Sequence, residues 1–354
     1  MRRREYEAPA ALGLELFETS EAFHLAGAAA DGELVLKTLH GVVDDGWLCF
    51  HGAPAGEKTS LLGCQVVVSV EETVARVPSY FVDTERACPA TTLFRAAQAR
   101  GVLTAIDEPA RKARVLQRLM EKLQPEGGHQ PIEATSPLYR AAVKGLLIAG
   151  VSLGELTAKA KLMQNKNDET RARVLEQLWL RGAPGDVRAI ELILAANPST
   201  TTPAFLQGPR GVRLHACLHS AAQSSGHLDE AVALLRGAYW NDVFTEAELG
   251  AAHRGSPVWV GATDEQGALI GTARAITDTS KYAWVYDVCV RPDWRGRGVG
   301  QALMTLVLDH PQVRRCRRIR LGTRDAQTLY ARFGFVDTSM LRRPYVTTEM
   351  VLVR

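Results

Sequence analysis

The sequence predicts an α+β protein made of two unlike domains, a sheet-rich N-terminal domain followed by a mixed α/β domain. Three observations lead to this prediction. Between residues 23 and 70, short apolar strands alternate with tight turns. Residues 197–203 are small and polar with two prolines, which is typical of a linker. Further on, a strand expected at residues 283–290 runs into a glycine-rich turn and then into a helix.

The composition is that of an ordinary globular protein. The chain has 354 residues, of which 46% are hydrophobic and 23% charged. A net charge of +3 is too small to indicate a nucleic-acid partner. The basic start at residues 1–5 is not followed by an apolar region, and the longest apolar run, residues 146–153, is too short to span a bilayer. We therefore expect a cytoplasmic protein with no nucleic acid and no membrane as partner.

The cysteines are scattered and indicate reduced thiols. There are six, with no C-x-x-C spacing. His215-x-Cys217-x-His219 has no second ligand pair elsewhere, so it favours strand alternation over a zinc site. We expect no metal.

The N-terminal domain, residues 1–200, is expected to form a small β-barrel with helices packed against it. Strands are predicted at residues 23–28, 34–43, 47–51 and 65–70, with Asp44-Asp45-Gly46 as a hairpin turn. An amphipathic helix is predicted at residues 110–123, and a second apolar strand region at 146–156. Asp168 is the expected N-cap of a helix at 169–180, and another helix is expected at 186–196.

One loop of this domain has the chemistry of a phosphate site. Lys58, Thr59 and Ser60 start a short helix after a Gly/Pro loop, and Lys37 lies on a preceding strand. Two cations and several donors could converge there on one phosphate. The alternative is a polar loop with a solvated lysine.

Two runs in this half resemble flavin-binding split barrels. Phe50, His51, Gly52, Gly56 and Lys58 resemble the "yFHga..G.K" run of nitroimidazole-resistance proteins in the pyridoxamine 5'-phosphate oxidase superfamily. Residues 159–166 resemble the "K.KLSQNR" run of FMN-binding negative transcriptional regulators, with methionine and lysine in place of serine and arginine. The resemblance covers residues 23–198. It implies an N-terminal split β-barrel that forms a homodimer, with FMN between the subunits and Lys37, His51, Lys58 and Thr59 among the cofactor-binding residues.

The C-terminal domain, residues 211–354, is expected to alternate helices and strands. Strands are predicted at residues 212–218, 258–263, 269–276 and 283–290, with a turn at 264–267. Helices are predicted at 227–239 and from Val299 to His310. The basic run at 314–320 is interpreted as a solvated face leading into a strand at 319–321 rather than as a ligand site.

The glycine-rich turn before the last helix suits a diphosphate. The first turn of a helix presents unpaired N–H groups, and glycines let a phosphate approach the backbone. The spacing excludes both G-x-x-x-x-G-K-[ST] and G-x-G-x-x-G. It resembles the [QR]-x-x-G-x-[GA] loop of the GNAT N-acetyltransferases, and residues 329–335 resemble their "LYxRFGF" signature. This second resemblance covers residues 212–354.

The GNAT resemblance implies a site for acetyl-CoA. The implied cofactor-binding residues are Val288, Val290, Arg295, Gly296, Arg297, Gly298, Val299, Gly300 and Gln301. Tyr330 would give a proton to the departing thiolate, since a phenol has a pKa near 10; the alternative is a core tyrosine beside Phe333. Asp287 would be the base, or it could cap a neighbouring backbone group. Asp325 stands where the family often has an asparagine.

The sequence thus predicts an acetyl-CoA-dependent N-acetyltransferase acting on a small amine, fused to a flavin-type domain of redox or ligand-binding role. Two alternatives remain at this stage. One is a flavin-dependent oxidoreductase whose C-terminal domain only binds CoA. The other is a non-enzymatic sensor of two ligands.

Overall fold

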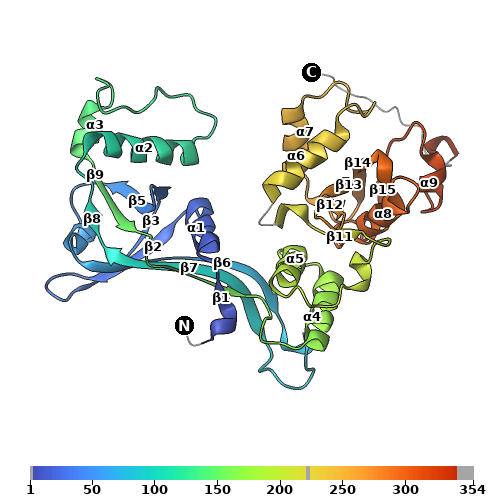
Figure 1. The fold of residues 1–354 in the computed structure, drawn as a ribbon, viewed down its shortest axis with the longest axis horizontal. Coiled ribbons are helices and arrows are strands. Elements are labelled where there is room, and N and C mark those ends of the chain that lie inside the picture. Colours follow the sequence, from blue (N-terminus) through green and yellow to red (C-terminus); the bar gives the residue numbers. More distant parts are fainter. Residues whose placement is uncertain (1–2, 221–223, 341–354) are drawn as a thin grey trace. The chain divides into compact units, whose positions relative to one another are not determined.

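A computed structural model describes residues 3–220 and 224–340. The chain divides into two compact units, Met1–Thr201 and Thr202–Arg354 (Figure 1). The first is rich in sheet, and the described part of the second packs helices on a sheet of five strands. The predicted α+β class is confirmed.

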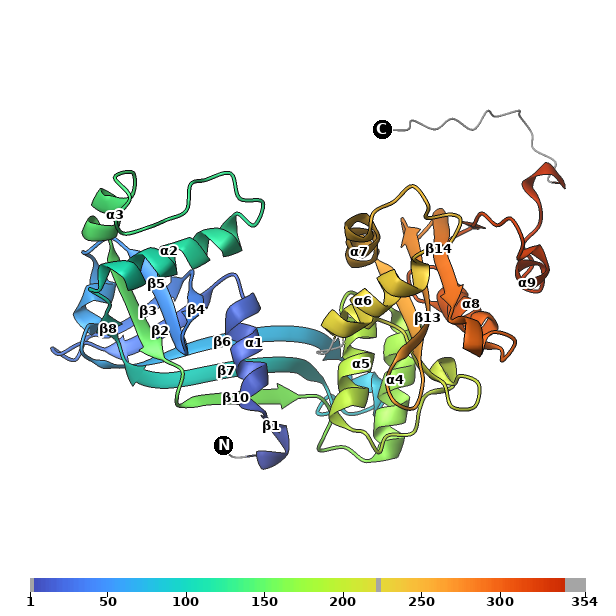
Figure 2. The same ribbon diagram turned by 45° about the horizontal axis from the view of Figure 1, so that its top comes forward.

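Two antiparallel sheets make up the first unit. The larger has the order β1-β10-β7-β6-β2-β3 and the smaller β4-β5-β9-β8. Their strands are β1 (Glu7–Ala8), β2 (Phe23–Ala28), β3 (Leu34–Leu39), β4 (Val42–Asp44), β5 (Trp47–Gly52), β6 (Gln65–Val77), β7 (Thr91–Val102), β8 (Thr104–Ala105), β9 (Leu147–Ser152) and β10 (Leu156–Lys161). β6, β7 and β10 form the long ribbon visible in Figure 2.

The strand predicted at residues 34–43 is in fact two strands in different sheets. The chain turns at Gly41, where a side chain would not fit, because an added Cβ would lie 2.6 Å from the Phe23 ring and 2.8 Å from the Cys49 carbonyl oxygen. The hairpin predicted at 44–46 is present. Asp45 and Gly46 both have positive φ, 49° and 72°, as a two-residue type I′ turn requires.

Helices cover the sheets of this unit and bury two apolar clusters. α1 (Ala10–Thr19) contributes Leu16 and Phe17 to a cluster with Leu25 and Phe50. α2 (Pro109–Leu123) and α3 (Arg140–Gly145) close a second cluster over the smaller sheet. Burial of these apolar faces is the main stabilising contribution.

The end of the first unit corrects the predicted helix cap, and the boundary between the units, after Thr201, falls within the predicted linker. α4 (Asp168–Arg181) is capped by Asn167, whose Oδ1 accepts the Thr170 N–H at 3.0 Å, and not by Asp168. After α5 (Asp186–Ala196), the segment predicted as a linker begins packed inside the unit: Asn197 is buried and donates to two carbonyls, and the Thr200 hydroxyl accepts from Arg171 at 2.7 Å. A polar composition alone did not reveal these partners.

The described residues of the second unit form a sheet of order β11-β12-β13-β14-β15, in which β14 and β15 run parallel. Its strands are β11 (Arg213–His215), β12 (Val258–Thr263), β13 (Leu269–Thr277), β14 (Tyr282–Val290) and β15 (Arg318–Arg320), and its helices α6 (Ser224–Leu235), α7 (Glu246–Gly255), α8 (Val299–Asp309) and α9 (Gln327–Ala331). The strand predicted at 212–218 is shorter than expected and is followed by a 3₁₀ turn. The helix predicted at 227–239 stops at Leu235.

Short 3₁₀ helices link several elements. They are η1 (Arg4–Tyr6), η2 (Glu57–Leu61), η3 (Ser79–Phe81), η4 (Ala204–Leu206), η5 (Leu218–Ser220), η6 (Pro292–Trp294) and η7 (Thr338–Met340). Within the described residues, no helix combines the length and apolar character that a bilayer span needs.

α8 and the pair α6–α7 pack on opposite faces of the second unit's sheet. A Cβ added to Gly271 would meet Leu303 and Val299 of α8, whereas Cys289 clusters with Leu235 of α6 and Leu249 of α7. The Val299, Leu303, Leu306 spacing gives α8 its buried stripe. The end of β14 is thereby held between two helical layers.

Candidate functional site

The second unit opens where β14 and β15 separate. The two strands pair only from Tyr282 to Trp284 with Arg318 to Arg320. On its other edge β14 bulges away from β13, because Asp287 and Val288 together face the single residue Ala273. Asp287 has a φ of 53°, which non-glycine residues seldom adopt and which is often found at functional sites. Among the described residues, β14 has no strand partner on the β15 side beyond Trp284.

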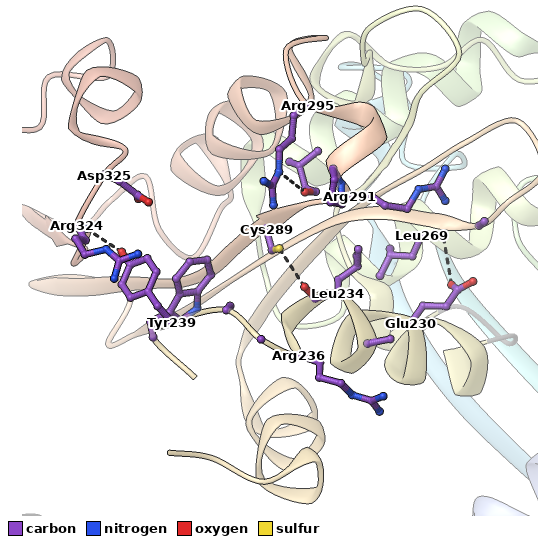
Figure 3. Close-up of a pocket in the computed structure, with 17 residues that line it drawn as sticks. Glu230, Leu234, Arg236, Tyr239, Leu269, Cys289, Arg291, Arg295, Arg324 and Asp325 are labelled. Carbon is purple, nitrogen blue, oxygen red and sulfur yellow. Dashed lines mark hydrogen bonds between the residues drawn. The ribbon is translucent and has the colours of Figure 1, made fainter. Parts of the chain in front are cut away.

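Two cavities meet at this opening and share lining residues. One, of about 690 Å³, lies between β14 and residues 321–330 and is lined by Asp287, Val288 and Tyr330. The other, of about 730 Å³, extends toward α6 (Figure 3). Both are lined by Tyr239, Trp240, Cys289, Val290, Arg295 and Asp325. We call the joined cavities the cleft.

The predicted glycine-rich loop lies at the end of β14 and opens α8. Gly296 and Gly298 have φ of 73° and 86°, and Gly298 is the N-cap residue of the helix. Arg295 Nε donates to the Val290 carbonyl oxygen at 3.1 Å, which ties the loop to the strand beside the cleft. The Arg297 guanidinium lies 4.8 Å from the centre of the Trp294 ring. Val299 is buried under the loop, and Gly298 and Gln301 line a smaller cavity of about 350 Å³.

Asp287 lies in the cleft, and its carboxylate accepts from three side chains. Arg274 Nε donates to Oδ2 at 2.5 Å, while Trp240 Nε1 and Asn241 Nδ2 donate to Oδ1 at 3.1 and 3.3 Å. The side chain is 3% exposed. The sequence predicted a base or a cap for a backbone group at Asp287, but not these side-chain donors, which come from the loop after α6 and from β13. Asp287 therefore acts as an anchor that holds the bulge of β14 to β13 and to the loop after α6.

Tyr330 lines the cleft from α9. Burial raises the pKa of its phenol above the ordinary 10.0, and the neighbouring Tyr239 and Asp325 raise it further. Its ring packs edge-on against Phe335 at 6.1 Å, not against Phe333 as the alternative interpretation expected. The hydroxyl therefore stays protonated at neutral pH and is available to give a proton.

Tyr239 joins the two sides of the cleft. Its hydroxyl accepts the backbone N–H of Arg324 at 2.8 Å, and the Arg324 guanidinium lies 3.8 Å from the centre of its ring (Figure 3). The loop after α6 is thereby fastened to the loop before α9. No local sequence pattern marks this pair, because its members are 85 positions apart.

In the first unit, the predicted phosphate residues gather around η2. Lys37 of β3 forms an ion pair with Glu57, which lowers the pKa of that carboxyl. Lys58 Nζ donates to the Ala55 carbonyl oxygen at 2.8 Å, and the Thr59 hydroxyl donates to that of Gly56 at 2.7 Å. A Cβ on Gly52 would lie 2.7 Å from Cε of Lys58, so this lysine packs on bare backbone, next to His51 on β5.

Lys159 and Lys161 of β10 lie apart from the predicted phosphate residues around η2 of the same chain. Lys161 donates to the Thr91 hydroxyl, and burial lowers the pKa of its ammonium group. Lys159 lies 5.7 Å from the Tyr6 ring centre. Three strands, β7, β6 and β2, separate β10 from β3 in the sheet. Within residues 3–220 and 224–340, no three His, Cys, Asp or Glu side chains are placed to hold a metal ion.

Comparison with known families gives one match in each unit. Residues 227–335 match the Acetyltransferase (GNAT) family, and residues 13–160 match the family described as Pyridoxamine 5'-phosphate oxidase. Among curated proteins, the chain is 37% identical over 70 residues to an uncharacterized N-acetyltransferase of Gracilaria tenuistipitata var. liui. That stretch covers 19% of this chain and only 38% of the relative.

Solved structures resemble each half. A putative acetyltransferase of the GNAT family from Xanthomonas campestris pv. campestris is 32% identical, with 39% of this chain and 96% of that chain covered and a TM-score of 0.33. A flavocytochrome from Azotobacter vinelandii is 17% identical, covering 43% and 66%, with a TM-score of 0.36. A putative 5-nitroimidazole antibiotic resistance protein from Bacteroides thetaiotaomicron is 17% identical, covering 41% and 80%, with a TM-score of 0.33.

Proposed function

Because the chain carries a domain of the acetyltransferase (GNAT) family at residues 227–335 and a pyridoxamine 5'-phosphate oxidase-like domain at residues 13–160, we propose that it transfers the acetyl group of acetyl-CoA to an amine. One observation carries the proposal. The start of α8, with two positive-φ glycines, lies at the end of the bulged strand β14, beside a cleft into which Tyr330 faces. The start of α8 can hold the diphosphate, the cleft beside β14 can hold the thioester, and Tyr330 can supply the proton.

The loop residues 295–301 would hold the pyrophosphate. The first N–H groups of a helix have no intrahelical partner and carry the positive end of the helix dipole, so they favour an anion. Arg295, which lines the cleft, adds a guanidinium that matches phosphate oxygens. The pantetheine arm would then run along the unpaired edge of β14.

The chemical step forms a C–N bond and breaks a C–S bond. The neutral amine attacks the thioester carbonyl, and backbone N–H groups at Val288 and Val290 would stabilise the resulting oxyanion. Collapse expels the thiolate, which takes the proton of Tyr330, and the phenolate recovers a proton from water. The proton lost by the amine leaves through water in the cleft. We assign Asp287 the role of anchor, because three donors already occupy its two oxygens.

The activity can be tested directly. Free thiol is followed while the protein is incubated with acetyl-CoA and a mixture of primary amines. We expect thiol release that depends on the amines and an acetylated product seen by mass spectrometry. Thiol release that is the same with and without amines would contradict N-acetyl transfer.

We also propose that the first unit binds FMN. The residues at η2 fit a phosphate in part: Lys58, which packs on the backbone of Gly52, and Lys37 supply two cations. Glu57 occupies Lys37 and would have to release it. FMN supplies one- or two-electron redox chemistry when bound. Titrating FMN into the protein and following flavin fluorescence tests the proposal, and fluorescence that never departs from that of free FMN would contradict it.

We further propose a homodimer formed through the first unit, and a cytoplasmic location. The family resemblance motivates the dimer, and six free cysteines suit a reducing compartment. The mass of the full chain in solution tests the dimer, with a monomer at micromolar concentration as the contradicting result.

A further inference from the structure

A partly exposed aromatic stripe runs along β14 away from the centre of the cleft. Tyr282, Trp284 and Tyr286 occupy alternate positions, so their side chains share one face of the sheet. The rings of Trp284 and Tyr286 are nearly parallel, at 13°, with centres 5.9 Å apart. Tyr282 is 42% exposed and the adjoining Ile276 of β13 is 51% exposed. Large apolar side chains grouped on a surface mark a binding site more often than scattered ones do.

This stripe forms the wall of a groove that continues the cleft. The groove has a volume of about 570 Å³ and is lined by Ile276, Tyr282, Trp284, Tyr286 and Arg320. Trp284 and Tyr286 also line the cleft beside Asp287 and Val288. A molecule whose amine lies at the bulge can therefore extend over the two stacked rings without leaving the surface.

Arg320 ends the groove with a charge that has no carboxylate partner among the described residues. Its guanidinium lies 5.7 Å from the centre of the Tyr282 ring and 5.8 Å from that of Trp284. Asp278 also lines the groove, but its Oδ1 accepts the backbone N–H groups of residues 280–282. At the other end of the stripe, Arg274 is already paired with Asp287. An unpaired guanidinium against an apolar wall favours a carboxylate, which it can bind through two hydrogen bonds.

We propose that the acceptor is a primary amine with a flat, apolar body and a carboxylate on the order of 10 Å from the nitrogen. The separation follows from the strand, since Arg320 pairs with Trp284 and the four residues from Val288 back to Trp284 span roughly 13 Å at about 3.3 Å per residue. A carboxylate hydrogen-bonded to the guanidinium lies about 3 Å nearer to the amine. A short peptide with an aromatic residue has these features. This inference rests on the proposed acetyl transfer and names the class of its acceptor.

The test compares three tripeptides of similar length: Gly-Trp-Gly, its C-terminal amide, and Gly-Ala-Gly. With the full-length protein and acetyl-CoA, we expect kcat/KM for the acid to exceed that for the amide by about tenfold, the scale of one charge-assisted hydrogen bond. Gly-Ala-Gly should be poorer than Gly-Trp-Gly by a similar factor.

Variants assign the preference to Arg320. Arg320→Gln should bring the acid-to-amide ratio close to one, and Arg320→Lys should restore part of it. Arg317→Gln, which removes an exposed charge from the same basic run, should leave the ratio unchanged. Melting temperatures and acetyl-CoA affinities of all three variants should match those of the wild type.

Three results would overturn the inference while leaving the proposed function intact. The first is a wild-type acid-to-amide ratio near one, and the second is a ratio that Arg320→Gln does not change. The third is that acetyl-CoA binds but none of the tripeptides is acetylated. Failure of acetyl-CoA to bind the wild type would instead contradict the proposed function itself, and this inference with it.

Discussion

Arg274 and Asp287 form an ion pair across the bulge between β13 and β14, with 2.5 Å between Nε and Oδ2 and the two side chains 12% and 3% exposed. Removing the guanidinium leaves a buried carboxylate with only two neutral donors. We therefore predict that Arg274→Met lowers the free energy of unfolding by about 3–5 kcal/mol, measured by denaturant unfolding at pH 7. The double variant Arg274→Met/Asp287→Asn should recover part of the loss, because the uncompensated charge is gone.

A surface ion pair is the matched control for this prediction. Arg236 and Glu246 are 66% and 61% exposed, so Arg236→Met should change stability by no more than about 1 kcal/mol. Equal losses in the two single variants would contradict an anchoring role for Asp287. Asp287→Asn also distinguishes an anchoring role from that of a general base. If Asp287 is an anchor, the variant keeps the pH profile of kcat/KM. If Asp287 is the base, the variant loses the acidic limb of that profile.

Tyr330→Phe should lower turnover and leave acetyl-CoA affinity nearly level. The phenyl ring keeps the edge-on packing with Phe335 but has no proton to give to the thiolate. We expect kcat to fall by about 10²-fold or more. Because the pKa of Tyr330 is raised above 10.0, wild-type kcat should show no loss from this group between pH 7 and 9. The checks are steady-state kinetics across pH and calorimetry of acetyl-CoA; equal kcat values, with chemistry rate-limiting, would refute the role.

Acid should destabilise the second unit through its buried histidines. Burial and the charge of Arg314 lower the pKa of His310 from 6.5 to about 3 in the folded protein. Above pH 6.5 both states are neutral, and below it the unfolded chain binds a proton that the folded chain does not, so stability falls as the pH drops toward 3. At pH 5.5 the loss from this group is about 1.4 kcal/mol. His253 acts with the same sign, since burial also lowers its pKa.

Denaturant unfolding at pH 7.5 and 5.5 checks this dependence. His310→Gln cannot bind a proton, so the difference between the two pH values should be smaller in that variant than in the wild type by roughly the amount assigned to His310. An equal or larger difference in the variant would show that the acid sensitivity lies elsewhere.

FMN affinity should respond in opposite directions to two substitutions at η2. Lys58→Ala removes a cation from the site and should weaken binding by about tenfold. Glu57→Gln frees Lys37 from its ion pair and should strengthen binding. Quenching of flavin fluorescence measures both. If neither variant moves the affinity of a protein that does bind FMN, the phosphate lies at another place.

The sequence could predict the parts of the structure that depend on neighbouring residues. The alternation from Ala283 to Val290, the glycine turn and the spacing of Val299 and Leu303 gave β14 and α8 almost to their ends. β12 was predicted at its observed bounds. β7 was missed, because its large apolar residues Leu93, Phe94 and Val102 do not alternate as in an amphipathic strand. Its place in the sheet comes from its pairing with β6 and β10.

The chemistry of the cleft depends on distant residues and could not be predicted in the same way. The bulge that turns Asp287 into the cleft is set by its register with β13, and its donors Trp240 and Asn241 lie more than 40 positions away. Arg320 was interpreted as part of a solvated basic face, but its side chain lies over two aromatic rings of β14. Only the fold brings these groups together.

The most direct test of the account is the affinity of acetyl-CoA for Gly300→Asp. A Cβ at Gly300 would meet Val290 and Leu329 at ordinary distances of 3.7 and 3.9 Å, so the side chain fits. A negative charge in the first turn also stabilises the helix, by about 0.3–1 kcal/mol, so the variant should fold at least as well as the wild type. Calorimetry should show acetyl-CoA binding weakened by about 100-fold or more, as expected for charge repulsion of a few kcal/mol, with the neutral Gly300→Asn weakened less. An affinity for Gly300→Asp within about twofold of the wild type, well inside 1.4 kcal/mol, would contradict the placement of the diphosphate at the start of α8.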